Sequence, residues 1–395
     1  MKLQRNITLL FLHGFFIKRF AFPVITLYIL SYSISFTQLG CIAAAATIAS
    51  ILTEIPGGIF ADKYGKRLSL ILASTFAIIY GILLTIGNGF VPFLVAAIFY
   101  GIGGAFLSGT TEAMLYDTLT DLHRKKEYKK VSGRLSFLTL LTSAAVLSIT
   151  PLVYEYNQKL PFIISVAFFA ISFVAAYLTT EPPKTAEETI IAPQLQFSRH
   201  LGEAFRQIRS IPYVSSIILL FTVVTIFWYI FGDYAQPLLQ LSGLNIIYFG
   251  LFYTVLRVLS GLASEIAHWL DGYFTIMQSI AGMLCIILIG FITVSIGKGV
   301  WLPISMIIID IGYWMLRVTL NDELNAHITS EQRTTVISLQ NFAVSITETV
   351  LILIFSRIAD KGGLQLAFQI ATITLFILMF TAFIKMRNQY IQKPQ

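Results

Sequence analysis

The chain has little charge and little cysteine for its length. Charged residues make up 12% of its 395 residues, whereas 56% are hydrophobic and 32 are Phe. A soluble domain of this size could not bury so much apolar surface, which excludes an ordinary soluble globular protein. The two cysteines, Cys41 and Cys285, lie far apart inside apolar runs. This placement excludes a disulfide framework and a thiolate metal site.

The sequence also lacks the short motifs that carry catalytic chemistry. H-E-x-x-H, G-x-S-x-G and Walker patterns are absent, and the five His residues are dispersed. We therefore expect no enzyme activity, no metal and no cofactor. The net charge of +7 reflects membrane topology and not nucleic-acid binding, because Lys and Arg concentrate in cytoplasmic loops. Without a nucleotide motif, any transport must draw on an ion or solute gradient.

Long apolar runs dominate what is present. A helix needs about 20 residues to cross ~30 Å of hydrocarbon. Runs of about this length occupy residues 7–32, 39–60, 68–87, 92–116, 131–152, 161–180, 213–240, 245–266, 273–297, 300–320, 334–356 and 364–384. They predict an all-α membrane protein with twelve transmembrane helices in two six-helix pseudo-repeats. The charged start is followed by no small-residue cleavage site, so we expect an uncleaved first span.

Orientation follows from the cations outside these runs. If both termini are cytoplasmic, the outer side holds only four of them, Lys159, Lys298, Arg357 and Lys361. The positive-inside rule therefore predicts a multi-pass protein of the bacterial inner (plasma) membrane with cytoplasmic termini. One inner loop, residues 265–272, has acids and no Lys or Arg.

Domain organisation is predicted from the one long polar segment. It separates an N-terminal six-helix bundle, 1–180, from a C-terminal bundle, 213–395, and residues 181–212 form a cytoplasmic linker. Within the linker, apolar residues recur at helical spacing, namely Phe197, Leu201, Ala204, Phe205 and Ile208. They predict an amphipathic helix on the membrane surface. Packing of this helix on neighbouring loops is the alternative.

A short charged turn lies between the second and third apolar runs. Gly58 is followed by Asp62, Gly65 and the adjacent cations Lys66 and Arg67. This G-x-x-x-D-x-x-G-x-R spacing resembles the signature of the major facilitator superfamily in the loop between its second and third membrane helices. An ordinary basic turn is the alternative reading.

The resemblance implies a conformational latch on the cytoplasmic side. Asp117, in SGTTEAMLYD, is similar to the acidic residue on the fourth helix that pairs with the basic residue of the latch, here Lys66. Glu54 and Arg134 lie near the same ends of their helices, and we assign them to the latch as well. Residues 321–341 resemble the segment between the tenth and eleventh helices of the drug-efflux branch.

Ionisable residues fall on only some of the predicted helices. They are Lys18 and Arg19, Glu54, Glu112, Arg134, Asp233, Arg257, Asp310 and Arg317, and Glu348. The third, sixth, ninth and twelfth helices have none. A charge facing lipid costs about 2.5–3.5 kcal/mol, so charged helices should face a polar interior. Every third helix is then peripheral, which agrees with the facilitator fold, whose first, fourth, seventh and tenth helices line a cavity.

Three carboxylates are the predicted proton carriers, Asp233, Asp310 and Glu348. Arg257 is a candidate partner for Asp310 or Glu348, and Lys18 or Arg19 for Asp233. An amphipathic substrate could lie on nearby aromatic and amide side chains, namely Trp228, Tyr234, Gln236, Tyr313 and Trp314. Core or membrane-interface aromatics are the alternative for each of them.

These features predict a monomeric secondary active transporter that works by alternating access. We expect H⁺-coupled efflux of small amphipathic molecules. Uptake of an organic anion or metabolite is the alternative, because Lys18 and Arg19 would attract anions and residues 131–152 lack the Gly-Pro-rich stretch of drug antiporters. A polytopic membrane enzyme is a third reading, which would require clustered nucleophiles or metal ligands.

Overall fold

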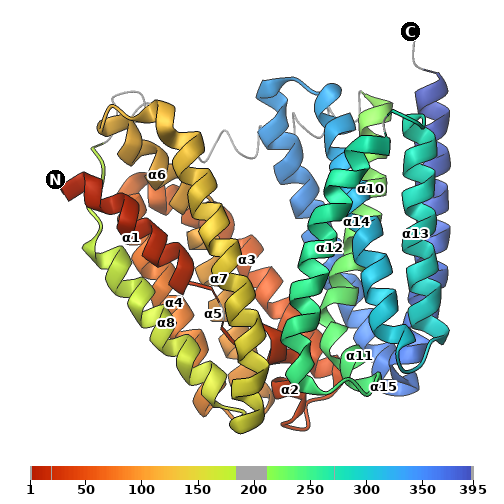
Figure 1. Ribbon diagram of the computed structural model, residues 1–395, viewed down its shortest axis with the longest axis horizontal. Coiled ribbons are helices and arrows are strands. Elements are labelled where there is room, and N and C mark those ends of the chain that lie inside the picture. The colour runs from red at the N-terminus through yellow and green to blue at the C-terminus, as the bar shows by residue number, and fades with distance from the viewer. Residues whose placement is uncertain (1, 19, 184–210, 271, 393–395) are drawn as a thin grey trace. The chain divides into compact units, whose positions relative to one another are not determined.

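The computed structural model describes residues 2–18, 20–183, 211–270 and 272–392, which fold into helices and connecting turns without strands (Figure 1). These residues belong to two compact units. Unit 1 comprises Met1–Ile191 and Ile246–Leu251, and unit 2 comprises Ala192–Asn245 and Phe252–Gln395. The amphipathic helix expected within the linker lies outside the described residues. The predicted domain boundaries therefore stay a prediction.

Unit 1 is built from the first six apolar runs. Its helical elements are α1 (Lys2–Phe16), η1 (Phe22–Val24), α2 (Ile25–Leu30), α3 (Phe36–Tyr64), α4 (Lys66–Ile86), α5 (Phe90–Leu107), α6 (Thr110–Asp121), η2 (Lys125–Glu127), α7 (Tyr128–Tyr156) and α8 (Leu160–Leu178). Ser35 caps α3, because its hydroxyl accepts from the Gln38 backbone N–H while the Gln38 side chain accepts from the Ser35 N–H.

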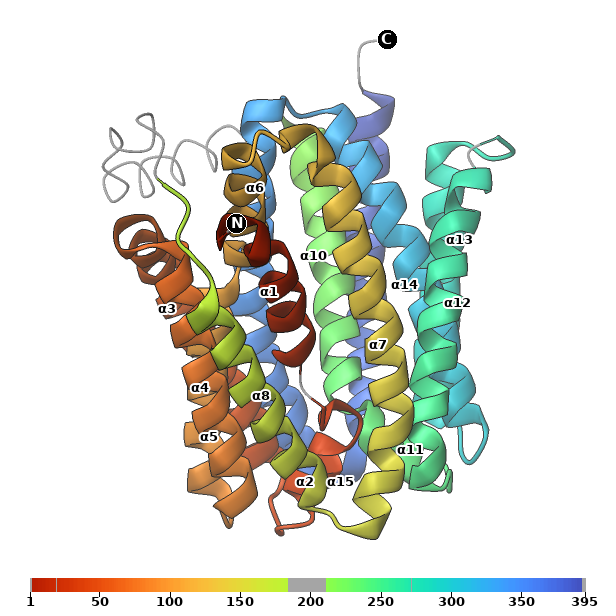
Figure 2. The same ribbon diagram turned by 60° about the vertical axis from the view of Figure 1, so that its left-hand side comes forward.

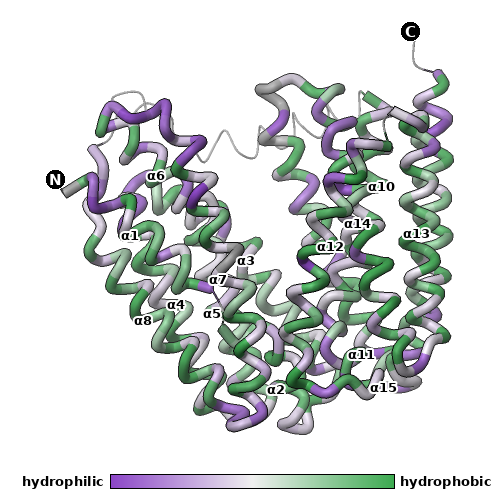
Figure 3. The backbone as a smooth tube through the Cα atoms, viewed as in Figure 1, coloured by the Kyte–Doolittle hydropathy of each residue, from purple (hydrophilic) through white to green (hydrophobic). Residues whose placement is uncertain are grey.

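The later runs build the remaining helices, α10 (Pro212–Asp233), α11 (Ala235–Leu241), η4 (Ile246–Tyr248), α12 (Phe249–Leu270), α13 (Ile276–Ile296), α14 (Trp301–Ala326) and α15 (Ser330–Ile391). The 62-residue α15 contains a non-helical residue, Gly363, with φ 81°. Glycine tolerates this left-handed conformation, so the chain turns there between the eleventh and twelfth apolar runs. Hydropathy is high along the middle stretches of the helices and lowest in the turns between them (Figure 3).

Within the described residues, ten helices are long and apolar enough to cross a membrane, with α15 counted as one from Val336. The prediction of an all-α membrane protein is confirmed. The count of twelve stays a prediction, because α15 merges two runs and the first run forms no single long helix.

Helix packing repeats between the units. In unit 1, α1 and α4 both contact α8, and α4 contacts α5; α1, α4 and α8 run side by side in both views (Figures 1 and 2). In unit 2, α10 and α13 both contact α15, and α13 contacts α14. The same members of each six-helix set therefore pack on one another, as related repeats would.

Three predicted spans are interrupted. The first breaks between α1 and η1, the fourth at Ser108 and Gly109, and the seventh at Tyr234. The tenth, α14, is continuous. Interruptions thus fall on three of the four helices that the resemblance assigns to a cavity lining, where broken backbone can be tolerated.

Candidate functional site

The Gly58–Arg67 segment joins α3 to α4 and is mostly helical, since α3 runs to Tyr64 and α4 begins at Lys66. The short charged turn expected from the sequence is therefore reduced to Gly65. Gly65 ends α3 with φ 105°, a conformation that side chains rarely adopt. Lys66 then begins α4, and its ammonium group forms an ion pair with Asp117 of α6. The side chains are only 17% and 24% exposed, so the pair is better shielded from water than a surface salt bridge. The structure thus brings together the two residues that the sequence paired.

Glu181 is a partner of this turn that the sequence analysis missed. Its carboxylate accepts hydrogen bonds from the backbone N–H groups of Lys66 and Arg67, at 2.7 Å each. A carboxylate suits the start of α4, where N–H groups lack intrahelical partners and the helix dipole is positive. Arg67 donates to the Tyr177 carbonyl at 2.6 and 3.2 Å. The end of α8 is therefore fastened to the start of α4.

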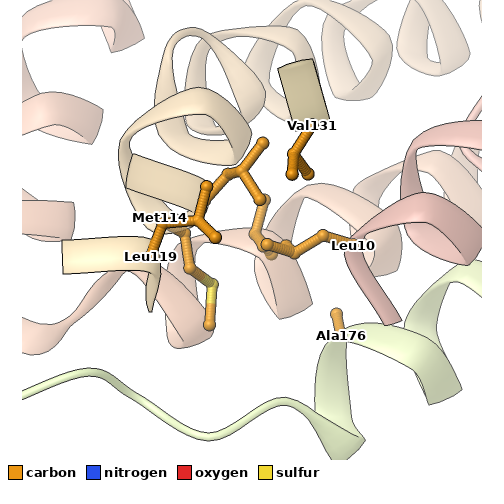
Figure 4. Packing of buried hydrophobic residues seen from close by; sticks show 7 residues of the cluster. Leu10, Met114, Leu119, Val131 and Ala176 are labelled. Atoms are coloured by element: carbon orange, nitrogen blue, oxygen red, sulfur yellow. The ribbon is translucent and has the colours of Figure 1, made fainter. Parts of the chain in front are cut away.

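An apolar cluster lies next to these polar contacts. It consists of Leu10, Leu70, Met114, Leu115, Leu119, Val131 and Ala176, which come from α1, α4, α6, α7 and α8 (Figure 4). Asn6 of α1 adds two hydrogen bonds to the backbone of Thr180. Its amide nitrogen donates to the Thr180 carbonyl at 2.7 Å, and its amide oxygen accepts from the Thr180 N–H at 2.9 Å. Five helices of unit 1 are joined at this end.

The other latch candidates lie on exposed surfaces of unit 1. Glu54, Gly58 and Asp62 lie in the second half of α3, and Arg134 lies in the second turn of α7. Glu112 is also exposed, in the first turn of α6, where the helix dipole favours an acid. The latch role of Glu54, Gly58, Asp62 and Arg134 stays a prediction, as does the cavity role of Glu112.

The break in the first span has its own hydrogen-bond partners. The Phe20 carbonyl accepts from Thr150 of α7 at 2.7 Å, and the Ala21 N–H donates to Ser165 of α8 at 3.3 Å. These buried contacts replace helical hydrogen bonds that the break removes. Lys18 lies exposed beside the break, and Arg19 lies outside the described residues.

Asp310 of α14 is the most deeply buried of the predicted carboxylates, with 6% of its surface exposed. One carboxylate oxygen accepts from the Trp228 indole of α10 at 2.9 Å. The other accepts from the Ser260 hydroxyl of α12. Asp310 therefore ties together the fourth helix of unit 2 and two of its neighbours through neutral donors. Arg257, its predicted partner, lies exposed on α12 and acts on Asp310 through its charge.

Aromatic rings surround this carboxylate. Trp228 stacks on Tyr313 with ring centres 4.2 Å apart and planes within 9°, and Trp314 meets Trp228 edge to face at 6.1 Å. The Arg317 guanidinium lies 4.8 Å from the Trp314 ring. Aromatic pairs contribute about 0.5–1.5 kcal/mol beyond burial, and a cation over a ring about 0.5–2 kcal/mol. The cluster is a stacked aromatic surface beside a buried acid.

Two further acids lie near this surface. Glu348 of α15 is close enough to Asp233 of α10 for their charges to interact, and both Glu348 and Arg317 act on the Tyr229 hydroxyl. The structure therefore brings together five of the predicted residues, Trp228, Tyr313, Trp314, Asp310 and Arg317. The acids Asp233 and Glu348 lie near them. The proposed pairing of Asp233 with Lys18 or Arg19 would join the two units and stays a prediction.

Two predicted lining residues lie in the interior of unit 2. Tyr234 is fully buried, with its ring 4.8 Å from that of Phe355, and Gln236 is 5% exposed in α11. Ser260 was missed by the sequence analysis, because a serine in an apolar helix gives no signal of its partner. Among the described residues, no group of three His, Cys, Asp or Glu side chains could hold a metal ion.

Comparisons with known proteins place this geometry in a family. The profile of the Major Facilitator Superfamily matches residues 7–351. An uncharacterised MFS-type transporter of Bacillus subtilis (strain 168), YxaM, is 24% identical over 165 residues, which is 42% of this chain. The alignment spans 40% of the length of that curated relative.

Solved structures show the same fold. A point mutant of the nucleoside transporter NupG matches with a TM-score of 0.79 at 12% identity, over 97% of this chain and 99% of that one. A D-xylose–proton symporter matches with a TM-score of 0.70 at 14% identity, over 99% and 97% of the two chains. Because the profile covers most of the sequence, the chain belongs to the Major Facilitator Superfamily.

Proposed function

We propose that this protein is a proton-coupled secondary transporter of small amphipathic molecules that carry a flat ring, working by alternating access. The observation that supports this proposal is Asp310, buried in unit 2 and held by Trp228 and Ser260 beside stacked aromatic rings. An ionised carboxylate at membrane depth is costly, and protonation removes that cost. Asp310 can therefore change protonation state when the access of the site to water changes.

The substrate class follows from the surface around Asp310. Trp314 and Tyr229 add aromatic area, and 41% of the Tyr229 side chain is exposed. Arg317 and Glu348 contribute opposite charges near Tyr229. An apolar wall with a few polar anchors binds a ligand that has both a ring and a polar or charged group. Sugars without a flat ring system would use this surface less well.

Efflux is the direction that we propose first, following the resemblance of residues 321–341 to the drug-efflux branch. Uptake of an organic anion or metabolite is the second candidate, and the cation Arg317 over Trp314 favours it. The similar structures include a nucleoside transporter and a D-xylose–proton symporter. Both candidates use the same carboxylate, so coupling can be tested before direction.

The test is a substrate screen in proteoliposomes with an imposed pH gradient. Asp310→Asn keeps an oxygen that can accept from the Trp228 indole and an amide that can donate to Ser260, but it cannot carry a proton at this position. We expect pH-driven transport to fall at least ~10-fold while substrate exchange without a gradient persists, the pattern of lost coupling. Asp121→Asn, an exposed acid at the end of α6, is the matched control.

The outcome can contradict the proposal clearly. If Asp310→Asn, and then a variant that neutralises Asp233, Asp310 and Glu348 together, kept pH-driven transport at the wild-type rate, the coupling role would be wrong. Asp62→Asn serves as the inactive-latch comparison, because it alters the last turn of α3 and leaves the aromatic cluster intact. The orientation of the vesicles that accumulate substrate then separates efflux from uptake.

A further inference from the structure

The connection between α6 and α7, which contains η2, and the first two turns of α7 carry a dense group of cations. We call it the α6–α7 basic patch, and it consists of Lys125, Lys126, Lys129, Lys130 and Arg134. All five side chains are exposed. This segment is one of the most hydrophilic parts of the chain in Figure 3.

The acids of this segment do not neutralise the patch. Glu127 lies within it, but both of its oxygens accept from the Arg124 guanidinium, at 2.8 Å each, in a forked pair. This pair raises the pKa of Arg124 above its ordinary value. Asp121 is the other acid of this segment. From Asp121 to Arg134 the chain therefore has six cations, Arg124 included, and two acids.

The position of the patch along α7 gives its depth in the bilayer. Residues 135–154 carry no ionisable acid or base of the Asp, Glu, Lys or Arg type, and Glu155 is the next charge after Arg134. At 1.5 Å per residue, Arg134 and Glu155 lie about 31 Å apart along the helix, which is the thickness of the hydrocarbon layer. The patch consequently lies at the level of the lipid headgroups.

Aromatic side chains beside the patch fit that level. The rings of Tyr116 and Tyr128 meet edge to face at 5.3 Å, and the Lys125 ammonium group lies 5.1 Å from the Tyr116 ring. Tyr is enriched at membrane interfaces, where its ring is apolar and its hydroxyl is hydrated. The aliphatic stems of the lysines can lie along apolar surface while their charges reach the phosphates.

We propose that the α6–α7 basic patch is a binding surface for the headgroups of anionic phospholipids. Charge complementarity supports this occupant, because phosphates at this depth belong to the bilayer and polybasic segments beside a membrane helix attract anionic lipids. The lysines supply mobile point charges that can follow a headgroup, whereas Arg134 can bind a phosphate with two parallel hydrogen bonds. Lipid bound here would steady the end of unit 1 that carries the Lys66–Asp117 pair.

The test uses the full chain in nanodiscs of equal parts phosphatidylglycerol and phosphatidylcholine, followed by detergent extraction and native mass spectrometry of retained lipid. The patch variant changes Lys125, Lys126, Lys129 and Lys130 to Gln. The control changes four exposed and separated lysines to Gln, namely Lys159, Lys298, Lys361 and Lys385. Both variants lose the same charge. Three of the control lysines lie on the predicted outer side, but both leaflets of the nanodisc have the same lipid composition, so the comparison tests clustering. A melting curve in phosphatidylcholine checks that each variant folds.

We expect the ratio of retained phosphatidylglycerol to phosphatidylcholine to fall at least tenfold in the patch variant, since each lysine near the surface contributes about fivefold. The control should keep most of its preference, and a variant with the four patch lysines changed to Arg should bind as the wild type does. Equal losses in patch variant and control would overturn the proposal. So would an unchanged ratio in the patch variant, or loss in the Arg variant.

Discussion

The carboxylate of Glu181 leads to the sharpest structural prediction. It accepts from two backbone N–H groups at the start of α4, those of Lys66 and Arg67. A hydrogen bond to a charged group contributes about 1.5–3 kcal/mol. Glu181→Gln keeps one accepting oxygen and loses both the second acceptor and the negative charge at the positive end of the helix. We expect the first turn of α4 to lose about 2 kcal/mol of local stability.

That loss has a direct readout in amide hydrogen exchange. If the first turn opens locally, about 2 kcal/mol corresponds to ~30-fold faster exchange of the Lys66 and Arg67 amides. Exchange would be followed by mass spectrometry on peptides that cover residues 65–72 in nanodiscs. Glu155→Gln, an exposed acid at the far end of α7, should leave those peptides unchanged. Glu181→Asp should fall between wild type and Gln, because it keeps the charge on a shorter side chain.

Two outcomes would contradict this reasoning. The first is an amide exchange rate at the start of α4 that changes less than about threefold in Glu181→Gln. This result would show that the carboxylate does not stabilise the first turn of α4. Equal acceleration across all of unit 1 would show a global effect and not a cap. Gly65→Ala gives an independent check, since a Cβ there would lie 2.8 Å from the Glu181 carboxyl carbon and φ is 105°. It should accelerate the same amides.

Three further variants test packing and hydrogen bonding. Gly101→Ala should lower the melting temperature, because its Cβ would collide with the Ala46 carbonyl oxygen of α3 and overpacking costs about 1–3 kcal/mol. Gly104→Ala, with nothing within 4 Å of the added Cβ, should not lower it. Thr150→Val should lower the stability of the protein by about 1–3 kcal/mol, because it leaves the buried Phe20 carbonyl at the break of the first span unpaired. Thr139→Val removes a hydroxyl that donates within α7, and it should cost less in the same thermal unfolding assay. Trp228→Phe should preserve the stacking on Tyr313 while removing the indole donor to Asp310. We expect pH-driven transport in proteoliposomes to be at least ~10-fold slower, with the melting temperature of the variant unchanged.

The helices were predictable because each apolar run is long enough to be recognised as a membrane span without information from the rest of the chain. Lys66 and Asp117 were also paired in advance, through their resemblance to a known signature, and the structure places them in contact. The neighbourhood of Asp310 and Trp228 was predicted in part, since both lie mid-helix among aromatics. Local pattern was sufficient for the helices, because each signal lies within one run. The pairing of Lys66 with Asp117, 51 residues apart, came from the resemblance and not from local pattern.

Contacts between distant segments that belong to no known signature were not predictable. Glu181 reads as the first acid of a polar linker, and nothing near it indicates that α8 ends beside α4. Ser260 and Thr150 are single small polar residues in apolar helices, whose partners are 50 and 130 residues away. The broken first span was missed for the same reason. Its hydropathy is that of a continuous helix, and the groups that stabilise the break belong to other spans.

The interrupted first span bears on how the protein is made. The piece before the break, α1, has 15 residues, and the piece after it consists of η1 with 3 residues and α2 with 6. They are about 22 and 15 Å long, so neither crosses a bilayer alone. The side chains that satisfy the backbone between them, Thr150 and Ser165, leave the ribosome 130 and 144 residues later. The first span can therefore adopt its final form only after the fifth and sixth spans have entered the membrane. Biogenesis of unit 1 must therefore finish by remodelling its own beginning.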